Sequence, residues 1–374
     1  MLPAEGEPAA VAIVQGDGQT AKVGAALDDS LVVRVTDTRD RPVADATVAF
    51  VLIDGSGQIT INAGQLRPDT VRTDADGRAA SRWTLGASAG AQRAEARVVG
   101  AANPLIAKFT ATAGAGRAAA LAAVSGDKQS APAGAPLPDS LVVRASDAAG
   151  NPVAGASVTW SVTGGGSVSA PTTATDAAGL TAVQRILGPN AGAQAAVART
   201  AGVSAPVIFT ATATAGSAAR ISIISGNNQS AAAGSALPAP LVVRIVDADA
   251  NGVPGRSVAW VIGQGGGSAN PATSKTDANG QASTSWTLGP AAGTNTLTAV
   301  VSDVGSVVFT ASAGPSGSRS GVSASPTTFV AGQGSSNVTV TVRDAGGNPL
   351  SGIAVRIAAS GDGNTIAQPN GPTN

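Results

Sequence analysis

Apolar and polar residues alternate one by one along much of this chain, in short runs separated by Gly, Asp, Asn and Pro. Residues 31–36 show the pattern: Leu31, Val33 and Val35 share one face of an extended segment, while Arg34 and Thr36 share the other. We find no convincing stretch in which apolar residues recur with the helical period of 3.6. The pattern therefore predicts an all-β protein in which Arg34 points to solvent.

The strand-like segment that contains Arg34 recurs three times at nearly constant spacing. The equivalent segments are residues 31–34, 141–144, 241–244 and 340–343, each ending in Arg. Subtracting the numbers of these four arginines gives steps of 110, 100 and 99 residues. Solenoid and propeller repeats are shorter, roughly 20 to 50 residues, whereas a β-sandwich domain has about 100. The spacing predicts a tandem array of one small domain, with three complete copies and part of a fourth.

Each copy carries the same landmarks in the same order. A first strand and a polar turn precede the Arg strand, which an Asp-to-Pro turn and a strand with one large ring follow. A Gly triplet, a Thr-Asp-x-x-Gly turn, a strand ending in Leu-Gly and a closing Phe-Thr-Ala strand complete the copy. In the second copy these landmarks are residues 121–124, 126–129, 141–144, 147–152, 158–162, 164–166, 175–179, 185–188 and 209–211. About seven strands per copy, with turns every ~8 to 12 residues, predict an immunoglobulin-like sandwich.

Two local motifs resemble parts of catalytic sites, but their context favours turns. The Gly triplets at residues 55–57, 164–166 and 265–267 could cradle phosphate only if a helix followed, and a strand pattern follows instead. We expect them to be hairpin connections. Residues 125–128 fit the Ser-x-x-Lys pattern of penicillin-recognising enzymes, but they follow a strand rather than begin a helix. We expect an ordinary turn there.

The landmarks also set the expected domain limits. We predict an N-terminal extension at 1–8, Ig-like domains at 9–115, 116–216 and 217–315, and an incomplete Ig-like domain at 316–374. The joints at residues 113–116 and 215–217 are short, so an elongated, semi-rigid rod of tandem sandwiches is expected. The last segment lacks the Thr-Asp-x-x-Gly turn and the closing strand. We therefore expect it to be poorly packed, and the chain to be a piece of something longer.

Composition removes several classes of function. Lys plus Arg and Asp plus Glu are 23 each, and aromatics are 2% of the chain, so neither the charge nor the stacking platforms favour nucleic-acid binding. His and Cys are absent, which excludes a Ser-His-Asp triad, a Cys nucleophile and an ordinary zinc site. No apolar run approaches the roughly 20 residues of a membrane helix, so we expect no membrane insertion by this segment. Residues 1–8 do not resemble a signal peptide.

The landmarks resemble a known family of domains. The Asp-x-x-Gly-Asn-Pro turn with its flanking strands at residues 142–158, Thr-Asp-x-x-Gly at 175–179 and Trp-Thr-Leu-Gly at 286–289 resemble the bacterial immunoglobulin-like domains of group 1, the invasin and intimin type. The resemblance covers nearly the whole chain. It implies the stalk of an outer-membrane adhesin, in which a barrel precedes the array and a receptor-binding tip follows it. Neither a barrel nor a tip is recognisable in this sequence.

One position of the repeat carries different side chains in different copies. Trp83 and Trp286 occupy the place that Arg185 takes in the second copy. A position that accepts both a ring and a guanidinium is expected near the rim of the sandwich, where a long stem lies on apolar surface and the charge stays in water. A half-exposed Trp there could stack on a sugar ring, although covering the end of the core is the favoured role.

Carboxylates gather at the turns and raise the question of calcium. The groups are Asp37, Asp40 and Asp45, then Asp74 and Asp76, and finally Asp247 and Asp249. Ca²⁺ takes six to eight oxygen ligands, which such turns can supply. The copies differ, however, since Gly150 replaces Asp40 and Ala178 replaces Asp76. Turn-forming Asp is therefore the preferred interpretation, and we assign no catalytic, cofactor-binding or metal-ligating residue and no cofactor.

Three functions remain open from the sequence. The first is a non-enzymatic stalk of a bacterial cell-surface or secreted adhesin-like protein, outer-membrane-associated and extracellular, that projects a terminal module. Its host-cell receptor, surface receptor or glycan would then be bound by regions outside this chain. The second is a carbohydrate- or protein-binding Ig-like module. The third is an accessory region of a large secreted enzyme.

Overall fold

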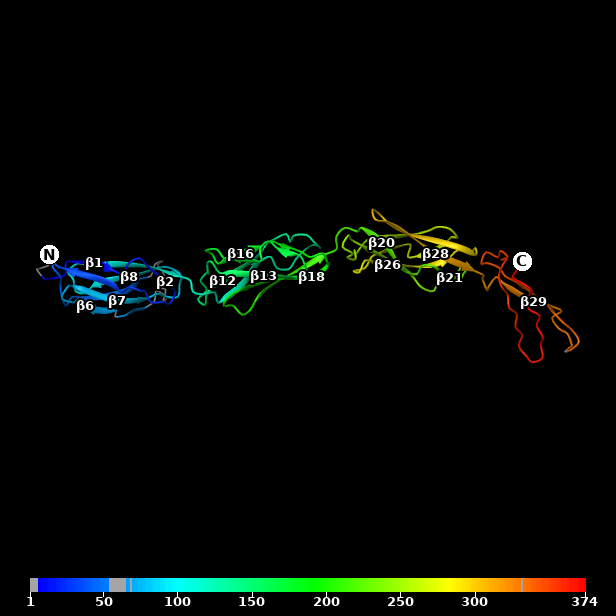
Figure 1. Cartoon of the computed structure of the whole chain (residues 1–374), viewed down its shortest axis with the longest axis horizontal. Coiled ribbons are helices and arrows are strands. Elements are labelled where there is room, and N and C mark those ends of the chain that lie inside the picture. Colours follow the sequence, from blue (N-terminus) through cyan, green and yellow to red (C-terminus); the bar gives the residue numbers. More distant parts are fainter. Residues whose placement is uncertain (1–5, 54–64, 68, 331) are drawn as a thin grey trace. The chain divides into compact units, whose positions relative to one another are not determined.

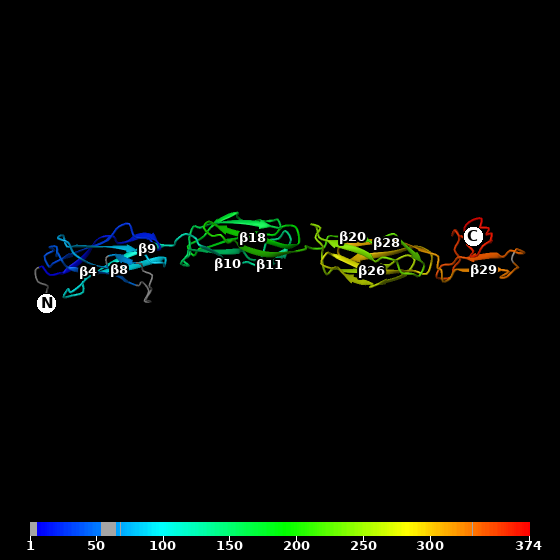
Figure 2. The ribbon, with the colours of Figure 1, turned by 90° about the horizontal axis from the view of Figure 1, so that it is seen from below.

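The computed structural model describes residues 6–53, 65–67, 69–330 and 332–374, with the side chains of 65–67 excepted. Strands are the only regular elements of these residues, and we observe no helix among them (Figures 1 and 2). The all-β fold predicted from the alternating pattern is confirmed. The chain groups into two compact units: Met1–Ala131, Ala135–Gly188 and Ala193–Thr212 form the first, and Pro132–Gly134, Pro189–Gly192 and Ala213–Asn374 form the second.

The first sandwich consists of two sheets that face each other across one core. One sheet has the order β1-β3-β7-β5 and the other β2-β9-β8-β4-β6. Their strands are β1 (Ala10–Gln15), β2 (Gln19–Lys22), β3 (Leu31–Thr36), β4 (Thr47–Ile53), β5 (Gln65–Arg67), β6 (Thr70–Arg72), β7 (Arg78–Thr84), β8 (Gly90–Val98) and β9 (Ile106–Gly114).

The third sandwich repeats this topology strand for strand. Its sheets have the orders β20-β22-β26-β24 and β21-β28-β27-β23-β25. The strands are β20 (Arg220–Ser225), β21 (Gln229–Ala232), β22 (Leu241–Val246), β23 (Ser257–Ile262), β24 (Gly267–Asn270), β25 (Thr273–Lys275), β26 (Gln281–Leu288), β27 (Gly293–Val301) and β28 (Gly305–Gly314). Two facing sheets with this repeated order, antiparallel except where β2 meets β9 and β21 meets β28, are the predicted immunoglobulin-like arrangement.

The second sandwich differs at one strand. Its sheets have the orders β10-β12-β16, β14-β17 and β11-β19-β18-β13-β15, because the strand that is continuous as β7 and β26 is here divided between β16 and β17. The strands are β10 (Ala120–Ser125), β11 (Gln129–Pro132), β12 (Leu141–Ser146), β13 (Ser157–Thr163), β14 (Ser167–Val168), β15 (Thr172–Ala174), β16 (Leu180–Val183), β17 (Arg185–Ile186), β18 (Gly192–Thr200) and β19 (Val207–Thr214). The division falls at Gln184, directly before the buried Arg185.

Each of these sandwiches has more described strands than the seven predicted, and one of the additional strands follows the polar turn. Gly16 turns the chain from β1, which pairs with β3, to β2, which pairs with β9. The φ of Gly16 is +95°, and a Cβ there would lie 2.3 Å from the Ser30 carbonyl oxygen. Only glycine satisfies both conditions, which explains why Gly126 and Gly226 occupy the same place.

The hairpin expected at the Gly triplets is wrong. β13 and β14 flank residues 164–166, and a hairpin would require these two strands to pair with each other. Instead, β14 pairs with β17, and β13 pairs with β15 and β18. The triplet of the third sandwich connects β23 with β24 in the same manner, from one sheet to the other. The crossing brings Gly265 so close that a Cβ on Gly289 would overlap its carbonyl oxygen at 1.6 Å. The triplet at residues 55–57 lies outside the described residues.

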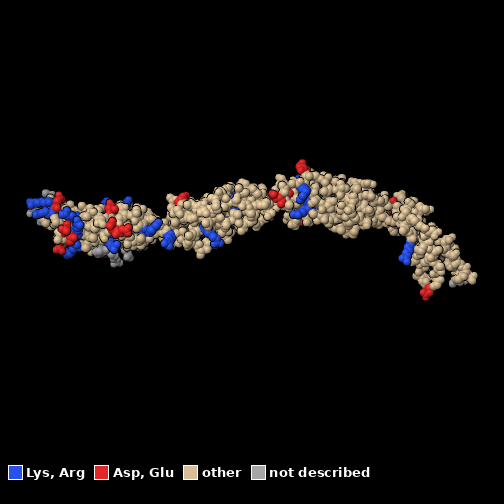
Figure 3. All heavy atoms as spheres, viewed as in Figure 1, with Lys and Arg blue, Asp and Glu red and all other residues tan. Residues whose placement is uncertain are grey.

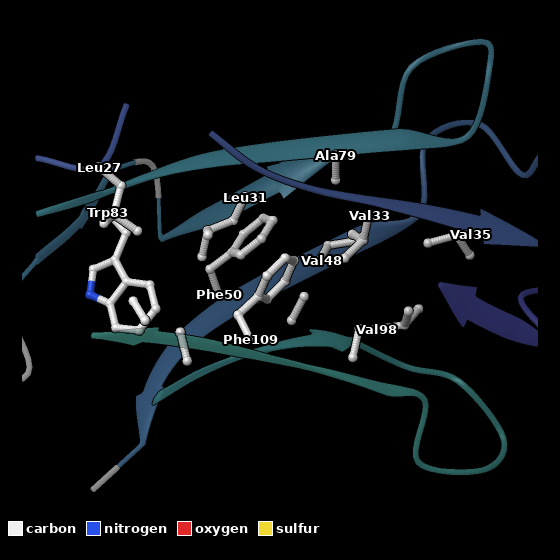
Figure 4. Packing of buried hydrophobic residues seen from close by; sticks show 14 of the residues in the cluster. Leu27, Leu31, Val33, Val35, Val48, Phe50, Ala79, Trp83, Val98 and Phe109 are labelled. Carbon is white, nitrogen blue, oxygen red and sulfur yellow. The ribbon is translucent and has the colours of Figure 1, made fainter. Parts of the chain in front are cut away.

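Each sandwich is filled by inward-facing apolar residues and aromatic rings. In the first, Phe50, Trp83 and Phe109 lie between the two sheets together with Leu31 and other aliphatic side chains (Figure 4). In the second and third, the rings of Trp160 and Phe209 and those of Trp260 and Phe309 pack with centroids 6.0 Å apart. The strand predicted to carry one large ring thus supplies a core anchor in each of the three sandwiches.

The fourth segment has no comparable core among its described residues. It forms only β29 (Gly321–Ser325) and β30 (Asn337–Thr341), which pair antiparallel. Several of its large apolar side chains lie in solvent, with Val322 72%, Phe329 52% and Val330 73% exposed, and none of its apolar side chains is fully buried among the described residues. The poor packing expected of this segment is confirmed. The predicted domain limits themselves stay predictions.

Candidate functional site: the junction turns

The turn after β12 is organised by one carboxylate. Asp147 Oδ1 accepts hydrogen bonds from the backbone N–H of Ala149 at 3.0 Å and of Asn151 at 2.9 Å, which closes the loop that the Asp-to-Pro motif predicts. The other oxygen, Oδ2, accepts from Asn151 Nδ2 at 3.0 Å. Asp147 itself is only 5% exposed, so these donors replace water around a buried charge. The turn is therefore a rigid element at the end of the sandwich.

Asn151 connects this turn to the preceding sandwich. Its Oδ1 accepts from the backbone N–H of Ala89 at 2.9 Å, and its Nδ2 donates to the carbonyl oxygen of Ala87 at 2.7 Å. Asp147 Oδ2 also accepts from the N–H of Gly116, in the linker, at 2.8 Å. Three separate segments are thus held together by two side chains. We name the Asp, the Asn and the groups they bind the junction clasp.

The second unit contains the same clasp, built from equivalent residues. Asp247 Oδ2 accepts from the N–H of Gly216 at 2.8 Å and from Asn251 Nδ2 at 3.0 Å. Asn251 accepts from the N–H of Ala191 at 2.8 Å and donates to the carbonyl oxygen of Pro189 at 2.8 Å. The recurrence of every bond shows that the clasp is a property of the repeat and not of one copy.

The other two copies keep the turn and vary its outer contacts. In the fourth, Asp344 accepts from Asn348, and the N–H of Gly346 donates to the carbonyl oxygen of Pro290 at 3.1 Å. In the first, Arg41 takes the place of Asn and binds Asp37 Oδ2 through Nη2 at 2.8 Å. Gly6 donates its N–H to Asp37 at 3.4 Å, as Gly116 does to Asp147.

We expect Asn151→Ala to loosen the first clasp without unfolding either sandwich. The substitution removes both hydrogen bonds to the loop at residues 87–89 and leaves the two cores untouched. Spin labels on cysteines introduced into the first and second sandwiches, in a chain that has no native Cys, should report a broader distance distribution. Asn151 is half-buried and also donates to Asp147, so the second sandwich should lose about 1 kcal/mol of stability, the net contribution of a typical hydrogen bond, and the first should be unaffected. An unchanged distribution would show that Asn151 does not restrain the junction.

The clasp carboxylates are held in their ionised form. Burial acts to raise the pKa of Asp147, but the side-chain amide of Asn151 and the N–H groups of Gly116, Asn151 and Ala149 outweigh it and lower the pKa. The pKa of Asp247 is lowered for the same reasons. At Asp37, burial is again outweighed, by the N–H groups of Arg39 and Arg41 and the Arg41 side chain, which bring the pKa to about 2. Donors that favour the anion thus surround each clasp carboxylate.

These pKa shifts predict how the clasp responds to acid. A carboxyl group whose pKa is lower in the folded state stabilises the fold above its unfolded pKa of about 3.9, and this contribution disappears as the pH falls through the folded pKa. We therefore expect Asp147→Asn to be less stable than the unmodified chain at pH 7, with the gap closing below about pH 4. Urea titrations of both chains across this range, followed by hydrogen exchange in the strands of the second sandwich, test the expectation. A gap that stays constant in acid would contradict it.

The surface around the first clasp forms a groove that contains few charged or polar side chains. A groove of about 520 Å³ is lined mainly by Ala, Gly and Val, with Arg117 and Asp147 as its charged residues. On the face shown in Figure 3, the second and third sandwiches are mostly uncharged. Within the described residues, no three His, Cys, Asp or Glu side chains lie close enough to hold a metal ion.

The structure corrects the expected rim position. Trp83 is 0%, Trp286 1% and Arg185 1% exposed, so all three side chains lie in the core and neither ring is available to a sugar. The Arg185 guanidinium donates to the carbonyl oxygens of Gly165 at 2.8 Å and Ile186 at 2.5 Å. It also donates to Thr163, Ser167 and the side chain of Gln194, each at 3.3 Å. A ring of oxygens, not the solvent, accommodates the charge.

The recurring Arg residues point away from the core, as predicted, and each also forms a hydrogen bond that the sequence did not predict. Arg34 and Arg144 are exposed and Arg244 is partly buried. Each donates Nε to a carbonyl oxygen of the Thr-Asp-x-x-Gly turn: Asp76 at 3.3 Å, Ala178 at 3.3 Å and Asn279 at 3.1 Å. The arginine therefore ties the Arg strand to that turn.

The remaining candidates lie in turns. Residues 126–128 follow β10, where Lys128 has a φ of +60° and Asp127 binds Thr210, so Ser-x-x-Lys is not at a helix start. Among the carboxylates weighed for calcium, Asp37, Asp74 and Asp247 each accept backbone N–H groups of their own turns. Those oxygens accept hydrogen bonds within the turns, as the turn-forming interpretation expects.

Comparison with known proteins adds a resemblance in fold. No family model and no curated protein sequence matches the chain significantly. Among solved structures, the chain is similar to FdeC, an Escherichia coli adhesin, at 19% identity over 83% of this chain and 98% of that chain, with a TM-score of 0.44. It is similar to invasin, a bacterial integrin-binding protein, at 17% identity, 89% and 76% coverage and a TM-score of 0.40. It is similar to Yersinia pseudotuberculosis InvD at 16% identity, 79% and 95% coverage and a TM-score of 0.45.

The chain resembles tandem Ig-like domains of the invasin and intimin type, as the landmarks indicate. Identities this low concern the fold alone, and the fold assignment rests on the strand topology of each sandwich.

Proposed function

We propose that this chain is a non-enzymatic spacer of a bacterial cell-surface or secreted adhesin-like protein, and that it holds a terminal module away from the cell. The observation that carries the proposal is the junction clasp, which recurs with the same bonds in both units. A chain that only needed separate domains would not need to fix their joints. Repeated joints of one design are what a spacer of defined reach requires.

Two further features support a structural role. Each sandwich has its own buried core, so each can fold and hold its shape without a partner sandwich. His and Cys are absent from the sequence, and the carboxylates of Asp37 and Asp247 are engaged in their own turns. Among the described residues we find no helix with the length and apolar character that crossing a membrane requires. Under the proposal, the chain is extracellular, and receptor or glycan binding belongs to other parts of the protein.

The reach of the chain in solution tests the proposal. Strands of about 6 to 8 residues at roughly 3.4 Å each give some 35 to 40 Å per sandwich, so three in line should exceed about 100 Å. Small-angle X-ray scattering should give a maximum dimension above this length. The double variant Asn151→Ala and Asn251→Ala, measured where every sandwich remains folded, should give a smaller average dimension. A compact particle from the unmodified chain would overturn the spacer.

A further inference from the structure

In the first and third sandwiches, an early strand lies beside the last strand and runs in the same direction. β2 pairs parallel with β9, from Gln19 opposite Ala111 to Lys22 opposite Gly114. β21 pairs parallel with β28, from Gln229 opposite Ala311 to Ala232 opposite Gly314. These are exceptions in sheets whose other described strand pairs are antiparallel.

The second sandwich has the same contact. β11 lies next to β19 in its sheet. Lys128 donates its N–H to Thr210 and Ala133 donates its N–H to Thr214, both at 2.8 Å. Because the partner number rises along both strands together, this pair is parallel as well. We name the three contacts the terminal patches.

The direction of these strands decides how a pull on the chain loads them. Force arrives at β21 from its start and leaves β28 from its end. On parallel strands these are opposite ends of the patch, so the two strands are drawn past each other and their hydrogen bonds are strained together. If the strands were antiparallel, both forces would act at one end and the bonds would break one after another.

A side-chain contact closes one end of each patch. Asp17 Oδ1 accepts from the N–H of Thr110 at 2.7 Å and from its hydroxyl at 2.9 Å. Asp127 accepts from the N–H of Thr210 at 2.7 Å and from its hydroxyl at 3.0 Å. In the third sandwich, Asn227 Oδ1 accepts from the N–H of Thr310 at 2.9 Å. The contact adds bonds to the patch at the point where the early strand begins.

We infer that each sandwich is a force-bearing unit, in which the terminal patch and its Asp/Asn–Thr contact resist extension of the chain. The source of the load rests on the proposed spacer role, since a tethered tip transmits force to the cell. The resistance rests on strand direction within each sandwich and is independent of the reach of the chain.

Single-molecule pulling on the third sandwich of the full chain tests this inference. The chain has no native Cys, so two introduced cysteines define the points of attachment. Ser217→Cys with Gly317→Cys, both exposed, pulls the patch from opposite ends. Ser217→Cys with Ser302→Cys attaches at the exposed turn before β28 and pulls both strands from the same end. Both chains contain the same sandwich, and equal melting temperatures would confirm this.

We expect the first pair to require a clearly higher rupture force than the second, because bonds strained together raise the barrier to forced unfolding, which the unfolding rate governs. Equal forces in the two geometries would overturn the inference. Asn227→Ala should lower the rupture force of the first pair and leave that of the second unchanged. An equal loss in both pairs would reduce Asn227 to a general contribution to stability and remove it from the mechanism.

The result is separable from that of the scattering experiment. A compact chain with a strong direction dependence would remove the spacer and keep the force-bearing unit. An extended chain whose rupture force does not depend on the pulling direction would keep the spacer and remove the force-bearing unit.

Discussion

Trp286→Ala should destabilise the third sandwich by about 3 to 5 kcal/mol, the usual cost of truncating a buried aromatic residue. The side chain is 1% exposed and packs in a cluster with Leu241, Val243 and Phe309. Its indole N–H has no hydrogen-bond partner among the described residues, so the loss should come from the lost apolar burial and the cavity, without a broken hydrogen bond. This substitution also tests whether the sandwiches fold independently.

Hydrogen exchange measured peptide by peptide distinguishes local from general effects. We expect faster exchange in β22, β26 and β28, and unchanged exchange in the strands of the first sandwich. Trp286→Phe, which refills most of the cavity, should recover much of the lost stability and serves as the control. Faster exchange throughout the chain would show that the sandwiches share one cooperative unit, and would contradict the independence that the spacer requires.

Arg185→Ala should destabilise the second sandwich by at least about 3 kcal/mol, because each buried acceptor left without a donor costs roughly 1 to 3 kcal/mol. The guanidinium now serves five oxygens, and within the described residues no carboxylate lies at ion-pair distance. Burial lowers the pKa of Arg185, which indicates that the charge is held at a cost. Urea unfolding followed by hydrogen exchange in the strands of the second sandwich measures the effect.

Arg185→Lys is the matched control for charge. Lysine keeps the positive charge but lacks the planar fork that reaches Gly165, Ile186 and Gln194 together. We expect it to recover little of the stability lost in the alanine variant. A lysine variant as stable as the unmodified chain would show that charge, and not the fork, is what the site needs.

The alternation of apolar and polar residues was sufficient to predict the all-β fold, and the spacing of the Arg strands to predict the repeat. Leu31, Val33 and Val35 face the core as expected, because a period of two leaves an extended chain no other way to bury them. The crossing at the Gly triplets was misassigned, since glycine satisfies a hairpin and a crossing between sheets equally well. Only the pairing of β14 with β17 distinguishes the two.

The candidate site was only partly predictable. The Asp-to-Pro turn is visible in the sequence because Asp147 acts on residues two and four positions away. The role of Asn151 is not, because its partners are main-chain groups about 60 residues distant, which leave no side-chain signal. Arg185 was placed at the rim for the same reason: the oxygens that bind it are mostly backbone carbonyls.

The reliance of Asn151 and Asn251 on main-chain groups has an evolutionary consequence. The loops at residues 87–89 and 189–191 differ in sequence, and both are recognised by the same amide with the same two bonds. A duplicated or deleted copy would therefore meet a compatible neighbour without any compensating substitution. Unequal recombination between such gene segments can lengthen or shorten the protein in whole-copy increments, so that its size can adapt rapidly.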